Sequence, residues 1–168
     1  MAQIAANPWS FASTDQATTV AITSIANNTG SILVTTTSAH GYTNQFTAIS
    51  IQGTTSYNGP YRILAIPSTT TLLLANQPKN FTAANGGAAG NVLSMAFLGN
   101  FRGEQVTWNP SAASQTLTLT DGYGDTIWNV TSQSAAPFGP FVYSKVFWVQ
   151  NGLVLNAMPG GTLEITVN

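Results

Sequence analysis

The sequence predicts an all-β protein, built from two small antiparallel units of β-sandwich or barrel type preceded by an N-terminal arm. Three observations predict this fold. Apolar and polar residues alternate in short runs, which is the pattern of a half-buried strand. Turn-forming residues separate these runs at short intervals. No long window repeats apolar residues at helical spacing.

The expected strands follow one another along the whole chain. In the first half they centre on Val20 and Ile22, Ile32 and Val34, Ile49 and Ile51, Tyr61 and Ile63, and residues 69–74. In the second half they centre on Leu117 and Leu119, and on Leu163, Ile165 and Val167. Between them stand turn sequences such as Asn28-Thr29-Gly30, Asp121-Gly122 and Asn151-Gly152. Residues 146–149 are continuously apolar, which indicates a strand buried on both faces or one in a subunit interface.

The chain divides into three expected parts. Residues 1–18 form an arm, residues 19–93 a first β unit, and residues 94–168 a second β unit. Residues 80–91, rich in Gly, Ala and Asn, form a linker or a long hairpin loop between the two halves. Each half is small for a self-sufficient core, so we expect packing between the halves or between chains.

Composition excludes several classes of function. Only four basic and five acidic residues occur among 168, which is 5% of the chain, against about 25% in ordinary soluble domains. A net charge of −1 does not supply the phosphate contacts of a nucleic-acid binder. No apolar stretch is long enough to span a membrane, and there is no cysteine for disulfide or thiol chemistry. A surface this poor in charge is typical of a protein packed against neighbours.

Several motifs in the first half resemble a known module. They are Ser38-Ala39-His40-Gly41-Tyr42, Ile49-Ser50-Ile51-Gln52-Gly53, Tyr57-Asn58-Gly59, Tyr61-Arg62-Ile63 and Thr69-Thr70-Thr71-Leu72. Residues 19–93 resemble a small β module repeated in tailed-bacteriophage virion proteins. That module is similar to the first catalytic cysteine half-domain of ubiquitin-activating enzymes, although the phage copies carry no such chemistry. Tyr42 departs from the pattern, which usually has Leu there.

The resemblance implies a structural protein of the virion. The expected role is a head decoration, or cement, protein on the capsid surface that binds the major capsid protein. We also expect a homo-oligomer, with a trimer favoured because capsid lattices present local three-fold sites. Two alternatives stay open: a carbohydrate-binding fibre or tip module, and a neck, tail or baseplate adaptor. The expected interface residues are Trp9, Phe11, Val146, Phe147, Trp148 and Val149.

Few residues offer chemistry, so we expect no enzyme, metal or cofactor. The only histidine, His40, lies in no nucleophile motif, and its neighbour Gly41 predicts a tight turn that ends a strand. Asp121 and Asp125 could hold Ca²⁺ through oxygens, but they more simply bracket a hairpin turn. The aromatic residues fill cores and interfaces, or else form a platform for sugars. Two acids lining one deep cleft beside exposed Trp rings would favour an enzyme instead.

Overall fold

The computed structural model describes residues 8–45, 47–75, 90–132 and 141–168. Of these described residues, 59% are in strands and 2% in helix, which confirms the predicted all-β class. It forms two compact units. The barrel unit contains residues 18–95 and 122–124, and the sandwich unit contains residues 1–17, 96–121 and 125–168.

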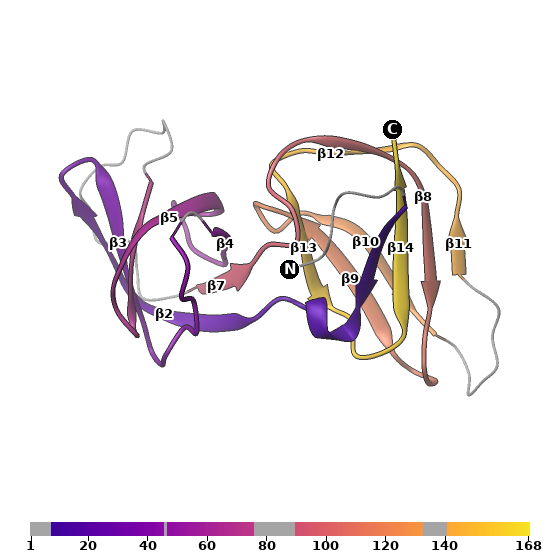
Figure 1. Ribbon diagram of the computed structural model, residues 1–168, viewed down its shortest axis with the longest axis horizontal. Coiled ribbons are helices and arrows are strands. Elements are labelled where there is room, and N and C mark those ends of the chain that lie inside the picture. Colours follow the sequence, from indigo (N-terminus) through magenta and orange to yellow (C-terminus); the bar gives the residue numbers. More distant parts are fainter. Residues whose placement is uncertain (1–7, 46, 76–89, 133–140) are drawn as a thin grey trace. The chain divides into compact units, whose positions relative to one another are not determined.

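The barrel unit is a closed antiparallel barrel of six strands in the order β2-β3-β6-β5-β4-β7 (Figure 1). Its strands are β2 (Thr19–Asn28), β3 (Ser31–Thr36), β4 (Ala48–Gln52), β5 (Gly59–Ser68), β6 (Thr71–Leu74) and β7 (Asn91–Ser94). Strand β7 pairs with both β2 and β4 and so closes the barrel. Closure leaves no sheet edge in this unit, and inward-facing side chains fill its interior.

Local sequence explains the β2–β3 hairpin well. Asn28 pairs with Ser31, so the loop holds two residues, Thr29 and Gly30, and both have positive φ. Positive φ at both positions is the type I′ turn, whose twist matches that of antiparallel strands. The alternation that follows places Ile32 and Val34 in the core, as the sequence predicts. The other core residues of the barrel are Ile22, Ile25, Ile49, Ile51, Tyr57, Tyr61, Ile63, Leu72, Leu74 and Val92.

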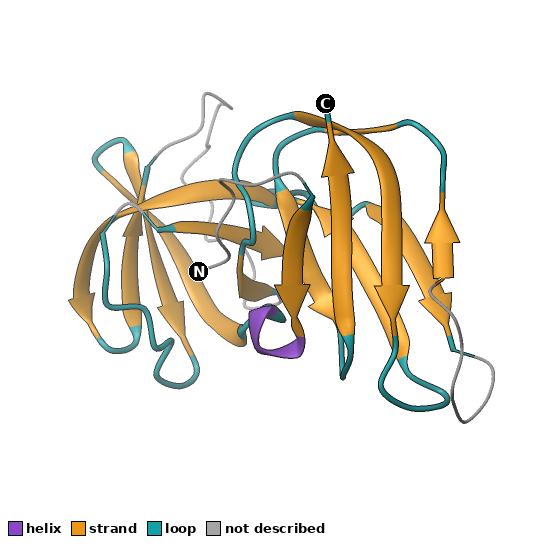
Figure 2. Cartoon of the chain, turned by 45° about the vertical axis from the view of Figure 1, so that its right-hand side comes forward, coloured by secondary structure: helices purple, strands orange, loops and turns teal. Residues whose placement is uncertain are grey.

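The sandwich unit contains two antiparallel sheets (Figure 2). The larger sheet has the order β1-β14-β8-β11, formed by β1 (Trp9–Ala12), β14 (Thr162–Val167), β8 (Phe101–Asn109) and β11 (Phe141–Tyr143). Strand β12 (Phe147–Val149) also pairs with β8. The smaller sheet has the order β10-β9-β13, formed by β10 (Thr126–Thr131), β9 (Thr116–Asp121) and β13 (Leu153–Ala157). Residues from both sheets, among them Trp108, Leu119 and Leu163, form one buried core.

The N-terminal segment differs from the expected arm. Its strand β1 pairs with β14, with Trp9 opposite Ile165 and Phe11 opposite Leu163, and one turn of 3₁₀ helix, η1 (Ser13–Asp15), follows. Trp9 and Phe11 are only 7% and 2% exposed. They belong to the core of the sandwich unit, so the prediction of a separate arm in residues 1–18 is corrected for the residues described.

The predicted boundaries between the units lie close to the observed ones. The units change at residues 17/18 and 95/96, against the expected 18/19 and 93/94. Of the expected divider at residues 80–91, residues 80–89 lie outside the described residues. Asn91 begins β7, a strand of the barrel. The C-terminal end of the expected divider is therefore part of the barrel unit.

Candidate interaction surface

Large apolar side chains are exposed along one edge of the sandwich unit. Val142 is 50% exposed, Tyr143 38%, Val146 47% and Trp148 70%. We call these four residues the apolar edge. They lie on β11, on β12 and on the short connection between them, and both strands pair with β8. Among the described residues, the one other large apolar side chain that is exposed is Leu64, on β5 of the barrel.

Strand β12 accounts for the continuous apolar run at residues 146–149. Its side chains alternate, so Val149 is buried and Phe147 is partly buried, whereas Val146 and Trp148 are exposed. Phe147 lies over Gly103, its partner on β8, at a point where a Cβ atom would collide with the ring. The run is therefore not buried on both faces. Its second predicted setting, a subunit interface, remains a prediction for Val146 and Trp148.

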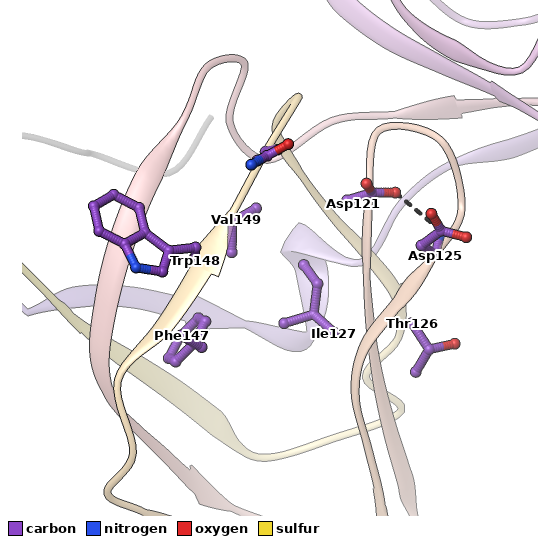
Figure 3. A pocket seen from close by; sticks show the side chains of 8 residues that line it. Asp121, Asp125, Thr126, Ile127, Phe147, Trp148 and Val149 are labelled. Carbon is purple, nitrogen blue, oxygen red and sulfur yellow. Dashed lines mark hydrogen bonds between the residues drawn. The ribbon is translucent and has the colours of Figure 1, made fainter.

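An open groove of about 350 Å³ lies beside β12. Its lining residues are Asp121, Asp125, Thr126, Ile127, Phe147, Trp148, Val149 and Gln150. Figure 3 shows Asp121 and Asp125 on one wall and β12 on the other. Phe147 and Val149 point from β12 toward Ile127, whereas the Trp148 ring is turned to the other side of the strand. The groove therefore has an apolar floor and an acidic rim.

The two aspartates bracket the β9–β10 hairpin, as the sequence predicts. The Asp125 backbone N–H donates to Asp121 Oδ1 at 2.9 Å, and the Asp121 N–H donates to the Asp125 carbonyl oxygen at 2.9 Å. Both carboxylates thus belong to one turn on one wall of an open groove. Hydrolysis of a glycosidic bond requires carboxylates that flank the bond. This arrangement favours binding over hydrolysis, and the absence of enzyme activity remains a prediction.

His40 lies in the loop after β3 and is buried in the barrel unit. Its Nε2 lies 3.0 Å from the carbonyl oxygen of Ser68, and its Nδ1 accepts a hydrogen bond of 3.1 Å from the Tyr42 N–H. A carbonyl oxygen only accepts, so Nε2 is the donor to Ser68. Gly41 has a φ of +74°, as predicted, although it lies in an irregular loop that begins after β3 ends at Thr36. Both ring nitrogens have structural partners, so His40 offers no ligand for a metal.

Two tyrosine hydroxyls in the barrel differ in their partners. Tyr61 Oη donates to the Tyr57 carbonyl oxygen at 2.9 Å. Burial raises the pKa of Tyr61, with smaller contributions from Tyr123 and Tyr57. Tyr42 Oη is also buried, and burial raises the pKa of Tyr42. Within the described part of the chain, Tyr42 Oη has no hydrogen-bond partner. Both groups therefore bear on the stability of the barrel.

The other acidic residues have local roles or face solvent. Glu104 lies 3.6 Å from Arg102 and accepts a hydrogen bond of 2.8 Å from the Asn168 amide. Asp15 accepts a hydrogen bond of 2.9 Å from the Ala12 backbone, and Glu164 is exposed on β14. Over the described ranges, no three His, Cys, Asp or Glu side chains gather as metal ligands. In the same ranges, no helix has the length and apolar character to cross a bilayer.

The sequence predicted only part of this surface. It identified Val146 and Trp148, but it missed Val142 and Tyr143, although the apolar triplet Phe141-Val142-Tyr143 offered a signal. It treated Asp121 and Asp125 as a turn and did not place them beside β12. No protein-family model, curated protein or solved structure matches this chain.

Proposed function

We propose that this chain is a structural protein of a tailed-bacteriophage virion, and specifically a head decoration protein that binds the major capsid protein and stabilises the capsid lattice. The observation that carries the proposal is the apolar edge: four large apolar side chains stand exposed on neighbouring segments of one unit. The resemblance of residues 19–93 to the phage module supports it. So does the surface, which is unusually poor in charge.

Such a protein would bind and stabilise the capsid through the surface area that it buries, without any chemical reaction. Trp and Tyr are enriched among the residues that dominate binding energy at interfaces, and the apolar edge contains one of each. At about 25 cal/mol per Å², burying about 1,500 Å² gives roughly 37 kcal/mol before the costs of association and ordering. Those costs absorb most of the gain. Repeating the contact over a capsid makes even a modest net affinity effective.

The test is the number of copies on purified virions, measured by quantitative mass spectrometry against the major capsid protein. We expect hundreds of copies per particle. Trp148→Ser should lower this occupancy, and Leu64→Ser serves as the matched control because Leu64 is exposed at 39% in the barrel unit. A handful of copies per particle would favour the neck, tail or baseplate adaptor. Equal occupancy of the two variants would exclude the apolar edge as the contact surface.

Trp148 also supports a second candidate function, a carbohydrate-binding fibre or tip module. Its ring is 70% exposed, and the flat apolar face of an indole packs well against the C–H face of a sugar ring. A glycan array with the purified protein tests this candidate. Binding that Trp148→Ala abolishes and Leu64→Ala preserves would favour the carbohydrate module over the decoration protein. Absence of glycan binding would leave the decoration protein as the proposal.

A further inference from the structure

The charged residues that line the groove beside β12 are all acidic. Asp121 and Asp125 stand on its rim, and none of its eight lining residues is basic. Asp125 is exposed, and its carboxylate forms no ion pair with any residue that the structure describes. Coulomb interaction at such a rim favours a cationic group and repels a phosphate or a carboxylate. The occupant of the groove should therefore bring a positive charge.

The floor of the groove selects an apolar side chain. Ile127, Phe147 and Val149 meet there, while the Trp148 ring is turned away from the two aspartates (Figure 3). The exposed Trp148 face is therefore not part of the groove floor. An apolar side chain next to a cationic one fits the floor and the rim together.

The chain itself exposes such a pair. Lys145 and Val146 lie on the connection between β11 and β12, where Lys145 is exposed and Val146 is 47% exposed. Lys145 has no ion-pair partner among the residues described. By contrast, Arg102 is engaged by Glu104. Lys145 and Val146 therefore match the groove in both charge and polarity.

The placement of Lys145 and Val146 outside the lining of the groove favours a contact between two molecules. Phe147 and Val149 point into the groove, whereas Val146, which is 47% exposed on the connection before β12, is not among the residues that line the groove of its own chain. An exposed side chain outside its own groove is available to the groove of another copy. Such a contact closes as a two-fold dimer when it is mutual, or as a ring such as the expected trimer when it is head to tail.

We propose that a second copy of this chain inserts Lys145 and Val146 into the groove. Val146 packs on Ile127 and Phe147, and Lys145 lies beside Asp125. This inference deepens the proposed function and rests on its premise of an assembling protein, because it names the contact between copies. The contact joins the groove to the apolar edge, of which Val146 is a member.

A charge exchange tests the proposal on the full-length protein. Sedimentation equilibrium at low salt compares the wild type with Asp125→Lys, Lys145→Glu and the double variant. We expect the wild type to be oligomeric. Each single reversal should raise the dissociation constant by at least about tenfold through like-charge repulsion, and the double variant should return to within about threefold of the wild type. Glu164→Lys is the matched control because it reverses an exposed charge of the same unit on β14.

A separate variant tests the apolar part of the contact, which Val146 makes. Val146→Asp should weaken association by at least about tenfold, with the β fold checked by circular dichroism. A wild type that is monomeric at about 100 μM would overturn the proposal, as would single reversals that associate as tightly as the wild type. A double variant that stays as weak as the single ones would also overturn it. None of these results touches the copy number on virions, so this inference can fail while the proposed function stands.

Discussion

Two buried tyrosine hydroxyls in the barrel provide a sharp test of the structure. Tyr61 Oη donates a hydrogen bond of 2.9 Å to the Tyr57 carbonyl oxygen at a buried site. Tyr42 Oη is buried, and within the described residues it lies within hydrogen-bond distance of no partner. Replacing either tyrosine with phenylalanine removes one oxygen and preserves the ring. The two variants therefore differ in whether the lost hydroxyl had a hydrogen-bond partner.

The structure gives opposite signs for the two changes in unfolding free energy. Tyr61→Phe loses a buried hydrogen bond and should destabilise the barrel by about 1–1.5 kcal/mol. Tyr42→Phe removes a hydroxyl that is desolvated without compensation, so it should leave stability unchanged or raise it by about 1 kcal/mol. The expected gap between the variants is therefore about 2 kcal/mol.

Urea unfolding followed by circular dichroism measures this gap. Tryptophan fluorescence is the internal control, because Trp9, Trp108, Trp128 and Trp148 all belong to the sandwich unit. A Tyr42→Phe variant destabilised as much as Tyr61→Phe would show that the Tyr42 hydroxyl is paired in solution. That result would refute the reasoning, and so would a Tyr61→Phe variant of wild-type stability.

Three further predictions follow from the packing. Above pH 10.0, the ordinary tyrosine pKa, the unfolded chain loses protons that Tyr42 and Tyr61 keep when folded. Unfolding free energy should then fall by up to about 1.4 kcal/mol per pH unit for each tyrosine, and urea titrations at pH 9 and 11 would show a smaller loss in the double Phe variant. His40→Ala should speed hydrogen exchange of barrel amides and spare the sandwich unit, because both ring nitrogens have backbone partners; unchanged exchange would contradict their role. Gly103→Ala should lower the urea midpoint by the equivalent of about 1–3 kcal/mol, since its methyl group would meet the Phe147 ring, and a wild-type midpoint would count against that contact.

The fold class and many strands could be predicted because their signals are local. The alternation of apolar and polar residues around Ile32 and Val34 indicates a strand with one buried face. The two-residue turn at Thr29 and Gly30 sets the register of the hairpin. The positive φ at Gly41 was likewise predictable, because glycine adopts that conformation more easily than other residues do. In each case the residues that determine the structure lie within a few positions of one another.

The N-terminal residues show where such local reasoning fails. From the sequence, Trp9 and Phe11 were expected at an interface on a separate arm. The alternation of apolar and polar residues around them is too short to predict a strand. Their partners, Ile165 and Leu163, lie at the other end of the sequence. No pattern within a short window specifies a pairing over that separation. Only the tertiary structure places these two aromatic residues in the core.

The candidate surface divides in the same way. The sequence by itself determined an all-β chain with little charge and an apolar run at residues 146–149. The pairing of β12 with β8 decided which of those side chains are exposed, and Gly103 decided where the Phe147 ring lies. The tertiary structure alone placed the aspartates of the β9–β10 turn beside that strand. The physical reason is that the alternation of apolar and polar residues depends on neighbours in the sequence. A groove, in contrast, is formed by segments far apart in the sequence that the fold brings together.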